Sequence, residues 1–263
     1  MTAKPRVSDE LIHLAHRLTD ASGAIISRYY RAKMDVETKD DQSPVTRADK
    51  EAEQAIRQIL EKERPNDSIH GEEFGSSTKR DGFLWVIDPI DGTKAFATGR
   101  PLFGTLIGLF IDGIPALGMI DQPVTKERWI GAVGHGTALN GTPVRCRPCA
   151  TLPQAQIATT GPSVFKREDY LKFLDITNRS SFTVYGGDCY SYGQLACGFL
   201  DSVIEGALKL HDYAALIPVV ESAGGKITTW QNTPLGVEDG NSVIASGDAR
   251  LHDELCGLLS GLN

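Results

Sequence analysis

The chain has 263 residues, of which 41% are hydrophobic and 23% are charged, and its formal net charge is −7. This composition is typical of a folded protein with a large buried core. The negative charge argues against nucleic acid as the main partner, because clustered Lys and Arg bind phosphate backbones. No run of about twenty apolar residues occurs, which argues against a membrane span. Residues 1–9 are polar and lack the apolar stretch of a signal peptide, so we expect a cytoplasmic protein.

The five cysteines show no spacing that indicates a disulfide framework. Cys146 and Cys149 form a Cys-x-x-Cys pair, a spacing that also occurs in redox and zinc sites. No second pair and no nearby His pair completes a tetrahedral zinc site, and no βαβ pattern surrounds it. We therefore expect reduced, structural thiols.

Two amphipathic helices are predicted first, because apolar residues recur there at helical spacing. In the second helix Thr46 is the predicted N-cap, Asp49 follows three residues later, and Pro65 stops the helix. The stripe of the first helix comprises Leu11, Leu14, Ala15, Leu18, Ile25, Ile26 and Tyr29, and that of the second comprises Ala52, Ala55, Ile56, Ile59 and Leu60.

Strands dominate the next part of the chain. The apolar run 83–87 predicts a buried strand that ends directly at Asp88. A hairpin around Asp112-Gly113 and a further meander are predicted at 105–111, 114–120, 128–133 and 137–139. The turn-rich segment 142–153 follows. We expect it to separate an N-terminal half, 1–150, from a C-terminal half, 151–263, within one compact unit.

Helices and strands alternate in the second half. Strands are predicted at 156–160, 182–185, 202–205 and 242–245, and helices at 164–176, 189–197, 212–223 and around Leu251 to Leu259. The order of helices, then antiparallel strands, then alternating elements predicts an α/β fold with helices layered on mixed sheets rather than a barrel.

Carboxylates at the ends of these elements are the candidate metal-binding and catalytic residues. Glu72 follows a short segment, Asp88 and Asp91 follow the buried strand, and Asp49 and Asp212 lie in first helical turns. Magnesium prefers one or two carboxylates together with water and substrate phosphate. Each carboxylate alone also fits a helix cap or a solvated turn, so the prediction depends on the whole set.

The segment Asp88-Pro89-Ile90-Asp91-Gly92-Thr93 is suited to hold both a cation and an anion. Pro89 stiffens the turn, so that both carboxylates can face one point while the Ile90 carbonyl stays free to bind a cation. Gly92 and Thr93 then offer backbone N–H groups to an anion. The segment therefore predicts metal ligands beside a phosphate cradle.

Three segments resemble the inositol monophosphatase family of lithium-sensitive, metal-dependent phosphatases: Gly71-Glu72-Glu73, residues 85–93 and residues 212–225. The resemblance covers nearly the whole chain. It implies the αβαβα sandwich of the wider superfamily that includes fructose-1,6-bisphosphatase. It also implies two or three Mg²⁺ ions in each active site, a homodimer, and a small phosphorylated metabolite as substrate.

Individual roles follow from the same resemblance. Asp49 and Thr93 match the pair that orients and activates the attacking water. Glu205 matches a contact to a substrate hydroxyl. The implied metal ligands are Glu72, Asp88, the Ile90 carbonyl, Asp91 and Asp212, and the implied substrate contacts include Asp91, Gly92, Thr93 and Lys94.

Departures from the usual pattern resemble one branch, the histidinol-phosphate phosphatases. Lys94-Ala95-Phe96 stands where inositol phosphatases have Thr-Asn-Phe, and His211 stands where many members have Trp. We expect His211 to pack in that Trp position. The segment 187–192 also resembles this branch, and its Asp188 is a suitable partner for an amine or imidazolium cation, although an Asp before a helix is often a cap.

Other functions stay open at this stage. An inositol phosphate is an alternative substrate, and a nucleotide 3′-phosphate is another, because a lysine after Asp-Gly-Thr also occurs in that branch. From a different class, a non-catalytic protein that binds metal or phosphate would also retain the fold. Magnesium-dependent phosphate release separates the enzymes from that protein.

Overall fold

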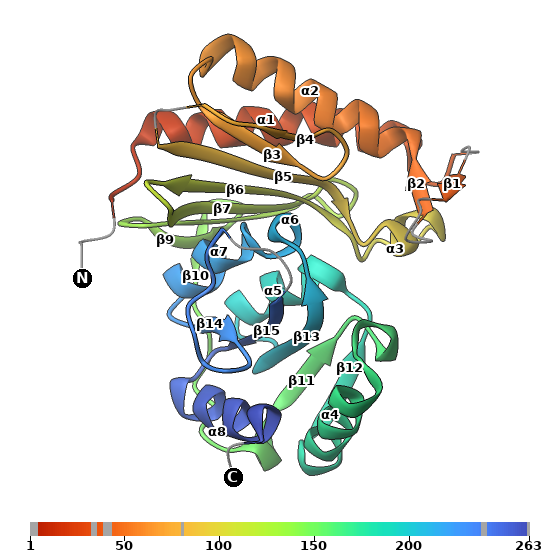
Figure 1. The fold of residues 1–263 in the computed structure, drawn as a ribbon, viewed down its shortest axis with the longest axis vertical. Coiled ribbons are helices and arrows are strands. Elements are labelled where there is room, and N and C mark those ends of the chain that lie inside the picture. Colours follow the sequence, from red (N-terminus) through yellow and green to blue (C-terminus); the bar gives the residue numbers. More distant parts are fainter. Residues whose placement is uncertain (1–4, 33–35, 39–43, 80–81, 238–240, 262–263) are drawn as a thin grey trace.

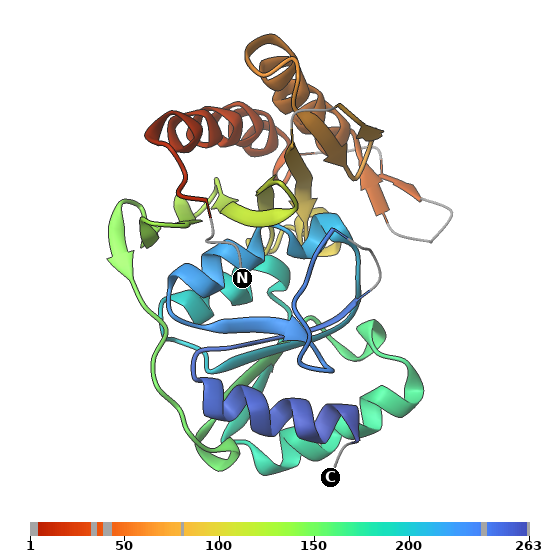
Figure 2. The same ribbon diagram turned by 60° about the vertical axis from the view of Figure 1, so that its left-hand side comes forward.

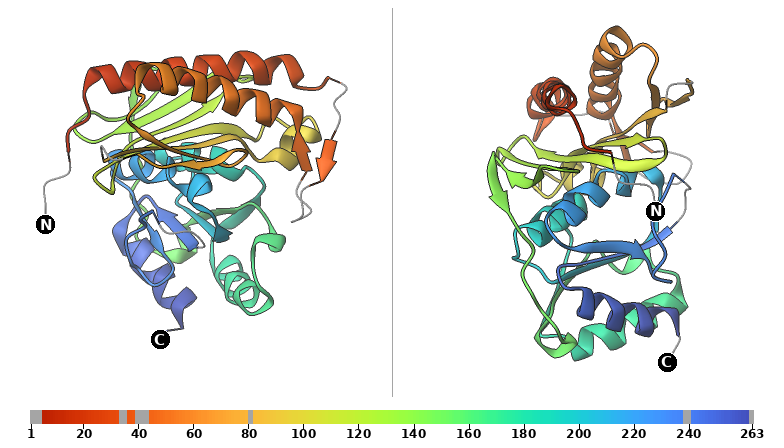
Figure 3. Two further views of the ribbon diagram at one scale, coloured as in Figure 1. Left: turned by 45° about the horizontal axis from the view of Figure 1, so that its top comes forward. Right: turned by 90° about the vertical axis from the view of Figure 1, so that its left-hand side faces the viewer.

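The structure is a computed structural model that describes residues 5–32, 36–38, 44–79, 82–237 and 241–261 (Figure 1). Helices and sheets alternate in layers, which confirms the expected αβαβα sandwich (Figures 1 and 3). The first helical layer holds α1 (Asp9–Tyr29) and α2 (Arg47–Glu63). The middle helical layer holds α5 (Asp188–Ala196), α6 (Leu210–Tyr213) and α7 (Leu216–Ser222). The last helical layer holds α4 (Arg167–Arg179) and α8 (Ala249–Ser260).

The first sheet has eight strands in the order β10-β9-β8-β7-β6-β5-β3-β4. Among the strands that the structure describes in this sheet, only β3 and β5 pair in parallel, with Gly71 opposite Ile87. This register places Glu72, just after β3, beside Asp88 of β5, and the Glu72 amide donates to the Ile87 carbonyl at 3.1 Å. The strands are β3 (Ser68–Gly71), β4 (Gly75–Ser77), β5 (Phe83–Asp91), β6 (Gly104–Ile111), β7 (Ile114–Gln122), β8 (Glu127–Ala132), β9 (Gly136–Leu139) and β10 (Thr142–Val144).

The second sheet has five strands in the order β12-β11-β13-β15-β14 and lies between the middle and last helical layers (Figure 2). β11 is parallel to β12 and β13, whereas β15 runs antiparallel to both its neighbours. The register of β13 shifts after Glu205, close to the first sheet. The strands are β11 (Gln156–Thr159), β12 (Phe182–Tyr185), β13 (Ser202–Leu208), β14 (Lys226–Thr229) and β15 (Asn241–Ser246).

Two glycines allow the middle helices to approach the first sheet closely. Gly108 and Gly118 are partners across β6 and β7. A Cβ at Gly118 would overlap the Ala215 carbonyl, and one at Gly108 would lie 3.0 Å from the Ala214 backbone. A side chain at either position would push the junction of α6 and α7 away from the sheet, and Asp212 of α6 would move with it.

Several elements differ from the predicted ones. The helix predicted over 212–223 is divided into α6 and α7, because Pro218 has no N–H to donate to the Ala214 carbonyl one turn earlier. The short strands β4, β10 and β14 were not expected, nor was the small pair β1 (Val36–Thr38) and β2 (Pro44–Thr46). α2 ends before Pro65, as predicted. The side chain of Thr46, the predicted cap, lies outside the described part of the chain.

All five cysteines are free thiols, as predicted. Among the described residues, Cys146 and Cys149 belong to no cluster of metal-ligating side chains. Within the same described ranges, no helix is both long enough and apolar enough to cross a membrane.

Candidate active site

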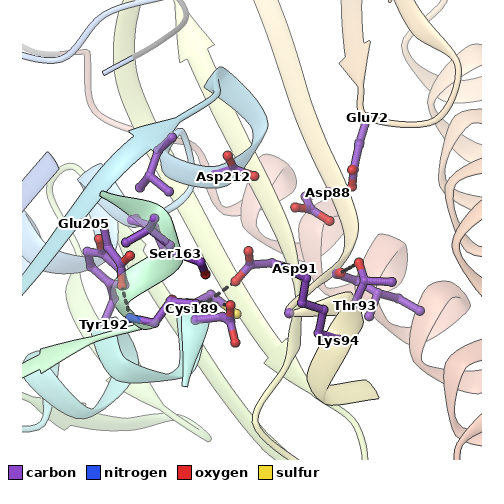
Figure 4. A pocket seen from close by; sticks show the side chains of 17 residues that line it. Glu72, Asp88, Asp91, Thr93, Lys94, Ser163, Cys189, Tyr192, Glu205 and Asp212 are labelled. Atoms are coloured by element: carbon purple, nitrogen blue, oxygen red, sulfur yellow. Dashed lines mark hydrogen bonds between the residues drawn. The ribbon is translucent and has the colours of Figure 1, made fainter. Parts of the chain in front are cut away.

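A cavity of about 270 Å³ lies where the end of β5 meets α5, α6 and β13 (Figure 4). It contains every candidate residue except Asp49: its lining includes Glu72, Asp88, Ile90, Asp91, Gly92, Thr93, Lys94, Asp188, Glu205 and Asp212. The two halves of the chain therefore contribute to one cavity, with the first sheet on one side and the second sheet on the other.

The end of β5 turns two carboxylates into this cavity. The pairing of β5 with β6 shifts between Asp88 and Asp91, and the Thr105 hydroxyl holds the Pro89 carbonyl at 2.8 Å. The Ile90 side chain is fully buried. The backbone carbonyl of Ile90 accepts a hydrogen bond from the Thr93 hydroxyl at 3.1 Å. This irregularity breaks the alternation of a regular strand, so that Asp88 and Asp91 face the same side (Figure 4).

Gly92 continues from this strand end in a conformation that suits glycine. Its φ of +86° lies in the left-handed region, and an added Cβ would lie 3.0 Å from the Leu102 carbonyl oxygen and 3.2 Å from the Asp188 carboxylate. The short helix α3 (Thr93–Ala97) follows at once. Gly92 and Thr93 line the cavity, and Gly92 lies next to Asp188.

The carboxylates of Asp88, Asp91 and Asp212 converge, with one oxygen of each lying within 4.8 Å of the others. Asp91 is held from the second half, because the Cys189 amide donates to its Oδ2 at 2.6 Å. Asp212 accepts from the Lys209 amide at 2.7 Å. The Oδ1 atom of Asp88 is buried and has no hydrogen-bond partner among the described residues.

Burial and neighbouring like charges both oppose ionisation of the carboxylates in this cluster. Burial raises the pKa of Asp88 well above its usual value, and Glu72, Asp91, Asp212 and Asp49 raise it further. The pKa of Asp91 is also raised by burial, followed by Asp188 and Asp212. A buried carboxylate oxygen without a donor, surrounded by like charges, fits a hard divalent cation. Asp49 is buried in the first turn of α2, near enough to act on Asp88.

The far end of the cavity is built by residues of the second half. The Thr160 amide donates to Glu205 Oε1 at 2.7 Å, and the Thr160 hydroxyl donates to Asp188 at 3.3 Å. Burial raises the pKa of Asp188, while Thr160, Lys94 and Arg100 lower it. Among the described residues, Glu205 Oε2 and the Tyr192 hydroxyl are buried without hydrogen-bond partners. This end therefore offers two acids and a phenol to the organic part of a ligand.

Comparisons with known proteins agree with this geometry. The model of the inositol monophosphatase family matches residues 8–262. The chain is 44% identical to the bifunctional phosphatase IMPL2, chloroplastic, of Arabidopsis thaliana, over 94% of this chain and 74% of that protein. It is 38% identical to the histidinol-phosphatase of Streptomyces coelicolor, over 97% of this chain and 98% of that protein. The structure superimposes on an inositol monophosphatase from Zymomonas mobilis with a TM-score of 0.87 and 46% identity, covering 96% of this chain and 98% of that one.

The chain belongs to the inositol monophosphatase family. It is thus a phosphatase of a family that depends on metal ions, and the acidic cluster fits that dependence. The names of its relatives include both histidinol-phosphatase and inositol monophosphatase, so family membership leaves the substrate open.

His211, where many members of the inositol monophosphatase family have Trp, is a packing residue here, as predicted. Its ring stacks on His70 with a centroid distance of 5.9 Å, and its side chain is buried. It does not line the cavity, and its Nε2 lies 3.6 Å from Asp212.

Some lining residues were not expected from the sequence. Tyr192 lies one helical turn after Asp188 in α5, and this spacing was the signal that could have placed both on one face. Thr160 and Ser163 come from the loop after β11, where the sequence shows no distinctive pattern. Their position depends on how the second sheet packs under α5.

Glu205→Gln is expected to flatten the pH dependence of stability in the metal-free protein. Burial raises the pKa of Glu205 from 4.5 to about 8, so the folded state takes up a proton between these values. Its contribution to stability is fully present below the unfolded pKa and is lost as the pH rises through the folded pKa. Thermal unfolding in a chelator, from about pH 5 to about pH 8.5, should show a steeper loss of Tm for the wild type. Equal slopes for both proteins would contradict this assignment.

Proposed function

We propose that this phosphatase is magnesium-dependent and hydrolyses L-histidinol phosphate to L-histidinol and phosphate. The observation that carries the proposal is one cavity with two groups of acids. Asp88, Asp91 and Asp212 converge, and one Asp88 oxygen has no donor among the described residues; Asp188, next to Gly92, and Glu205 lie on the side of the second half of the chain. The first group suits metal ions, and the second suits a cationic substrate.

The metal ligands in this proposal are Glu72, Asp88, the Ile90 carbonyl, Asp91 and Asp212, holding two or three Mg²⁺ ions. Bound magnesium would supply charge neutralisation at the phosphoryl oxygens and a lower pKa for water. The chain's own contribution is to keep these ligands converged. The Cys189 and Lys209 amides fix Asp91 and Asp212, and the pairing of β3 with β5 fixes Glu72.

Asp49 and Thr93 orient the attacking water in this proposal, and the Asp49 carboxylate accepts its proton. Asp49 lies at the start of α2 and is only 2% exposed, so its carboxylate has a restricted range of positions. The Thr93 hydroxyl is aimed by its bond to the Ile90 carbonyl. Positioning and charge stabilisation supply most of the rate in phosphoryl transfer, and no phosphoenzyme is expected.

The phosphate group binds at the Gly92 and Thr93 amides with Lys94 beside them, and the organic part extends toward Asp188 and Glu205. Histidinol phosphate carries an amine and an imidazole, which can donate hydrogen bonds to both acids, with the positive charge of the amine beside Asp188. Inositol 1-phosphate offers only hydroxyl groups. The Streptomyces histidinol-phosphatase matches the chain over nearly its full length, which supports the same choice.

Phosphate release with a magnesium titration tests the reaction. We expect histidinol phosphate to be hydrolysed with added Mg²⁺, activity to stop with EDTA, and excess Mg²⁺ to restore it. Unchanged hydrolysis in EDTA would contradict the metal-dependent scheme. No hydrolysis of any phosphomonoester with Mg²⁺ would favour the non-catalytic binding protein instead. The homodimer, the lithium sensitivity and the cytoplasmic location stay predictions.

Asp188→Asn should change which substrate the enzyme prefers. Losing a charge-assisted hydrogen bond to a buried acid costs about 1.5–3 kcal/mol, or about 10- to 100-fold in kcat/KM for a cationic substrate. Hydrolysis of inositol 1-phosphate should fall by less, because it brings no positive charge to this position. Asp169→Asn, on α4 outside the cavity, is the control. Equal losses for both substrates would contradict the role of Asp188.

A further inference from the structure

Glu72 stands in a turn, residues 72–74, between β3 and the short strand β4. On one side the turn is held by the first sheet, through the bond from the Glu72 amide to the Ile87 carbonyl. Its other side is held by α2, in the outer helical layer. The residues that make this second attachment are Glu53 and Arg57, one helical turn apart.

Glu53 is an acidic residue with no exposed surface. Its carboxylate accepts from the Glu73 amide at 2.8 Å, from the Phe74 amide at 3.3 Å and from Arg57 Nε at 2.7 Å. Arg57 Nη2 donates in turn to the Gly75 carbonyl. One ion pair of α2 therefore binds three consecutive residues of the chain directly after Glu72.

Gly71 makes this arrangement possible. A Cβ at Gly71 would overlap the Glu53 carboxylate and crowd Arg57 Nη2. The residue before Glu72 thus lies directly against the ion pair, and the residues after Glu72 are bonded to it. Glu72 is enclosed between two fixed points of the backbone.

An ion pair in this position is poorly explained by stability alone. Desolvating two charges cancels most of their attraction, and apolar side chains of similar volume often pack at least as well. Directional hydrogen bonds can hold the turn in a single geometry, which apolar packing cannot do. The carboxylate cluster needs such a geometry, because the pairing of β3 with β5 brings Glu72 beside Asp88 only while the turn keeps its place.

We propose that Glu53, with Arg57, is a positioning residue for Glu72. It holds the turn so that the Glu72 carboxylate stays beside Asp88 before a cation binds. This inference rests on the proposed function, in which Glu72 is a metal ligand. Residues that orient metal ligands from behind typically change metal affinity about 10- to 100-fold when they are replaced.

The test compares the full-length Glu53→Gln variant with the wild type in two measurements. Titration calorimetry of the metal-free proteins with Mg²⁺ should show about 10- to 100-fold weaker binding for the variant. Hydrogen exchange of the metal-free proteins, followed by mass spectrometry, should show faster exchange in peptides that cover residues 72–75. kcat at saturating Mg²⁺ should change much less than the magnesium concentration needed for half-maximal activity.

Glu63→Gln is the matched control. Glu63 is also on α2 and also pairs with an arginine, Arg17, but that pair is exposed and links α2 to α1 rather than to the turn. We expect its magnesium affinity and its exchange at 72–75 to equal those of the wild type. If Glu53→Gln does not fold, Arg57→Lys serves instead, because lysine keeps the charge but cannot bridge Glu53 and Gly75 with a planar fork.

Glu72→Gln distinguishes failure of this inference from failure of the proposed function. Wild-type magnesium affinity in Glu72→Gln would contradict its role as a metal ligand, and the inference would fall with it. Weakened affinity in Glu72→Gln, together with wild-type affinity and exchange in Glu53→Gln, would overturn the positioning role alone.

Discussion

Replacing Asp88 with Asn is expected to lower kcat by about 10³-fold or more while the protein stays folded. Asp88 is buried, has an oxygen without a donor among the described residues, and is the residue on which the other carboxylates of the cluster act. An amide in its place keeps the shape but removes the charge that holds a cation.

The same change should also remove the stabilisation by magnesium. Burial, followed by the like charges around it, raises the pKa of Asp88, so its ionised form is unfavourable in the metal-free protein at neutral pH. The metal-free Asp88→Asn protein should therefore have a Tm at least as high as that of the wild type, and added Mg²⁺ should raise it little.

Phosphate-release assays and thermal unfolding with and without Mg²⁺ measure both effects. Asp175→Asn, at an exposed position of α4, should behave as the wild type in both assays. The same outcome is expected for Asp91→Asn as for Asp88→Asn. A folded variant of either residue with normal kcat would contradict the proposed mechanism.

Asp49→Asn is expected to lower kcat by about 10²- to 10⁴-fold, the usual contribution of a positioned acid or base. In contrast to Asp88→Asn, it should change the magnesium affinity only a few-fold, since Asp49 is not among the proposed metal ligands. Thr93→Ala should act in the same direction because it removes the hydroxyl that is aimed by the Ile90 carbonyl.

Thr93→Ser is the control for this pair, because it keeps the hydroxyl, and it should retain most of the activity. Calorimetry with Mg²⁺ separates the two kinds of residue. If Asp49→Asn bound Mg²⁺ as weakly as Asp88→Asn but reached the wild-type kcat at saturating Mg²⁺, Asp49 would be a ligand instead of a water-orienting residue.

The strand before Asp88 was predictable because its apolar run stops abruptly at a charge, but β5 continues beyond the predicted end to Asp91. The convergence of Glu72 and Asp212 on Asp88 was less predictable. Glu72 meets Asp88 through the parallel pairing of β3 with β5, and four-residue β3 has too few positions to show a periodic pattern. Asp212 was placed in the right region, but the break after α6 depends on Pro218 and on the close contact with Gly118, which only the packed structure shows.

The organic end of the cavity was the least predictable part. Asp188 and Glu205 were recognised from a family pattern, whereas Thr160, which binds both, comes from a loop with no distinctive sequence. Tyr192 resembles any core aromatic residue until its buried hydroxyl is seen beside the cavity. Contacts between separate elements decide these positions, and local spacing carries little information about them.

The most direct test is a side-by-side measurement of kcat/KM with Mg²⁺ for histidinol phosphate, inositol 1-phosphate and adenosine 3′,5′-bisphosphate. All three can reach the same metal cluster, so differences among them report the organic end of the cavity. The proposal predicts that histidinol phosphate is preferred by about tenfold or more, the value of one charge-assisted hydrogen bond. A clear preference for inositol 1-phosphate or for the bisphosphate would contradict it.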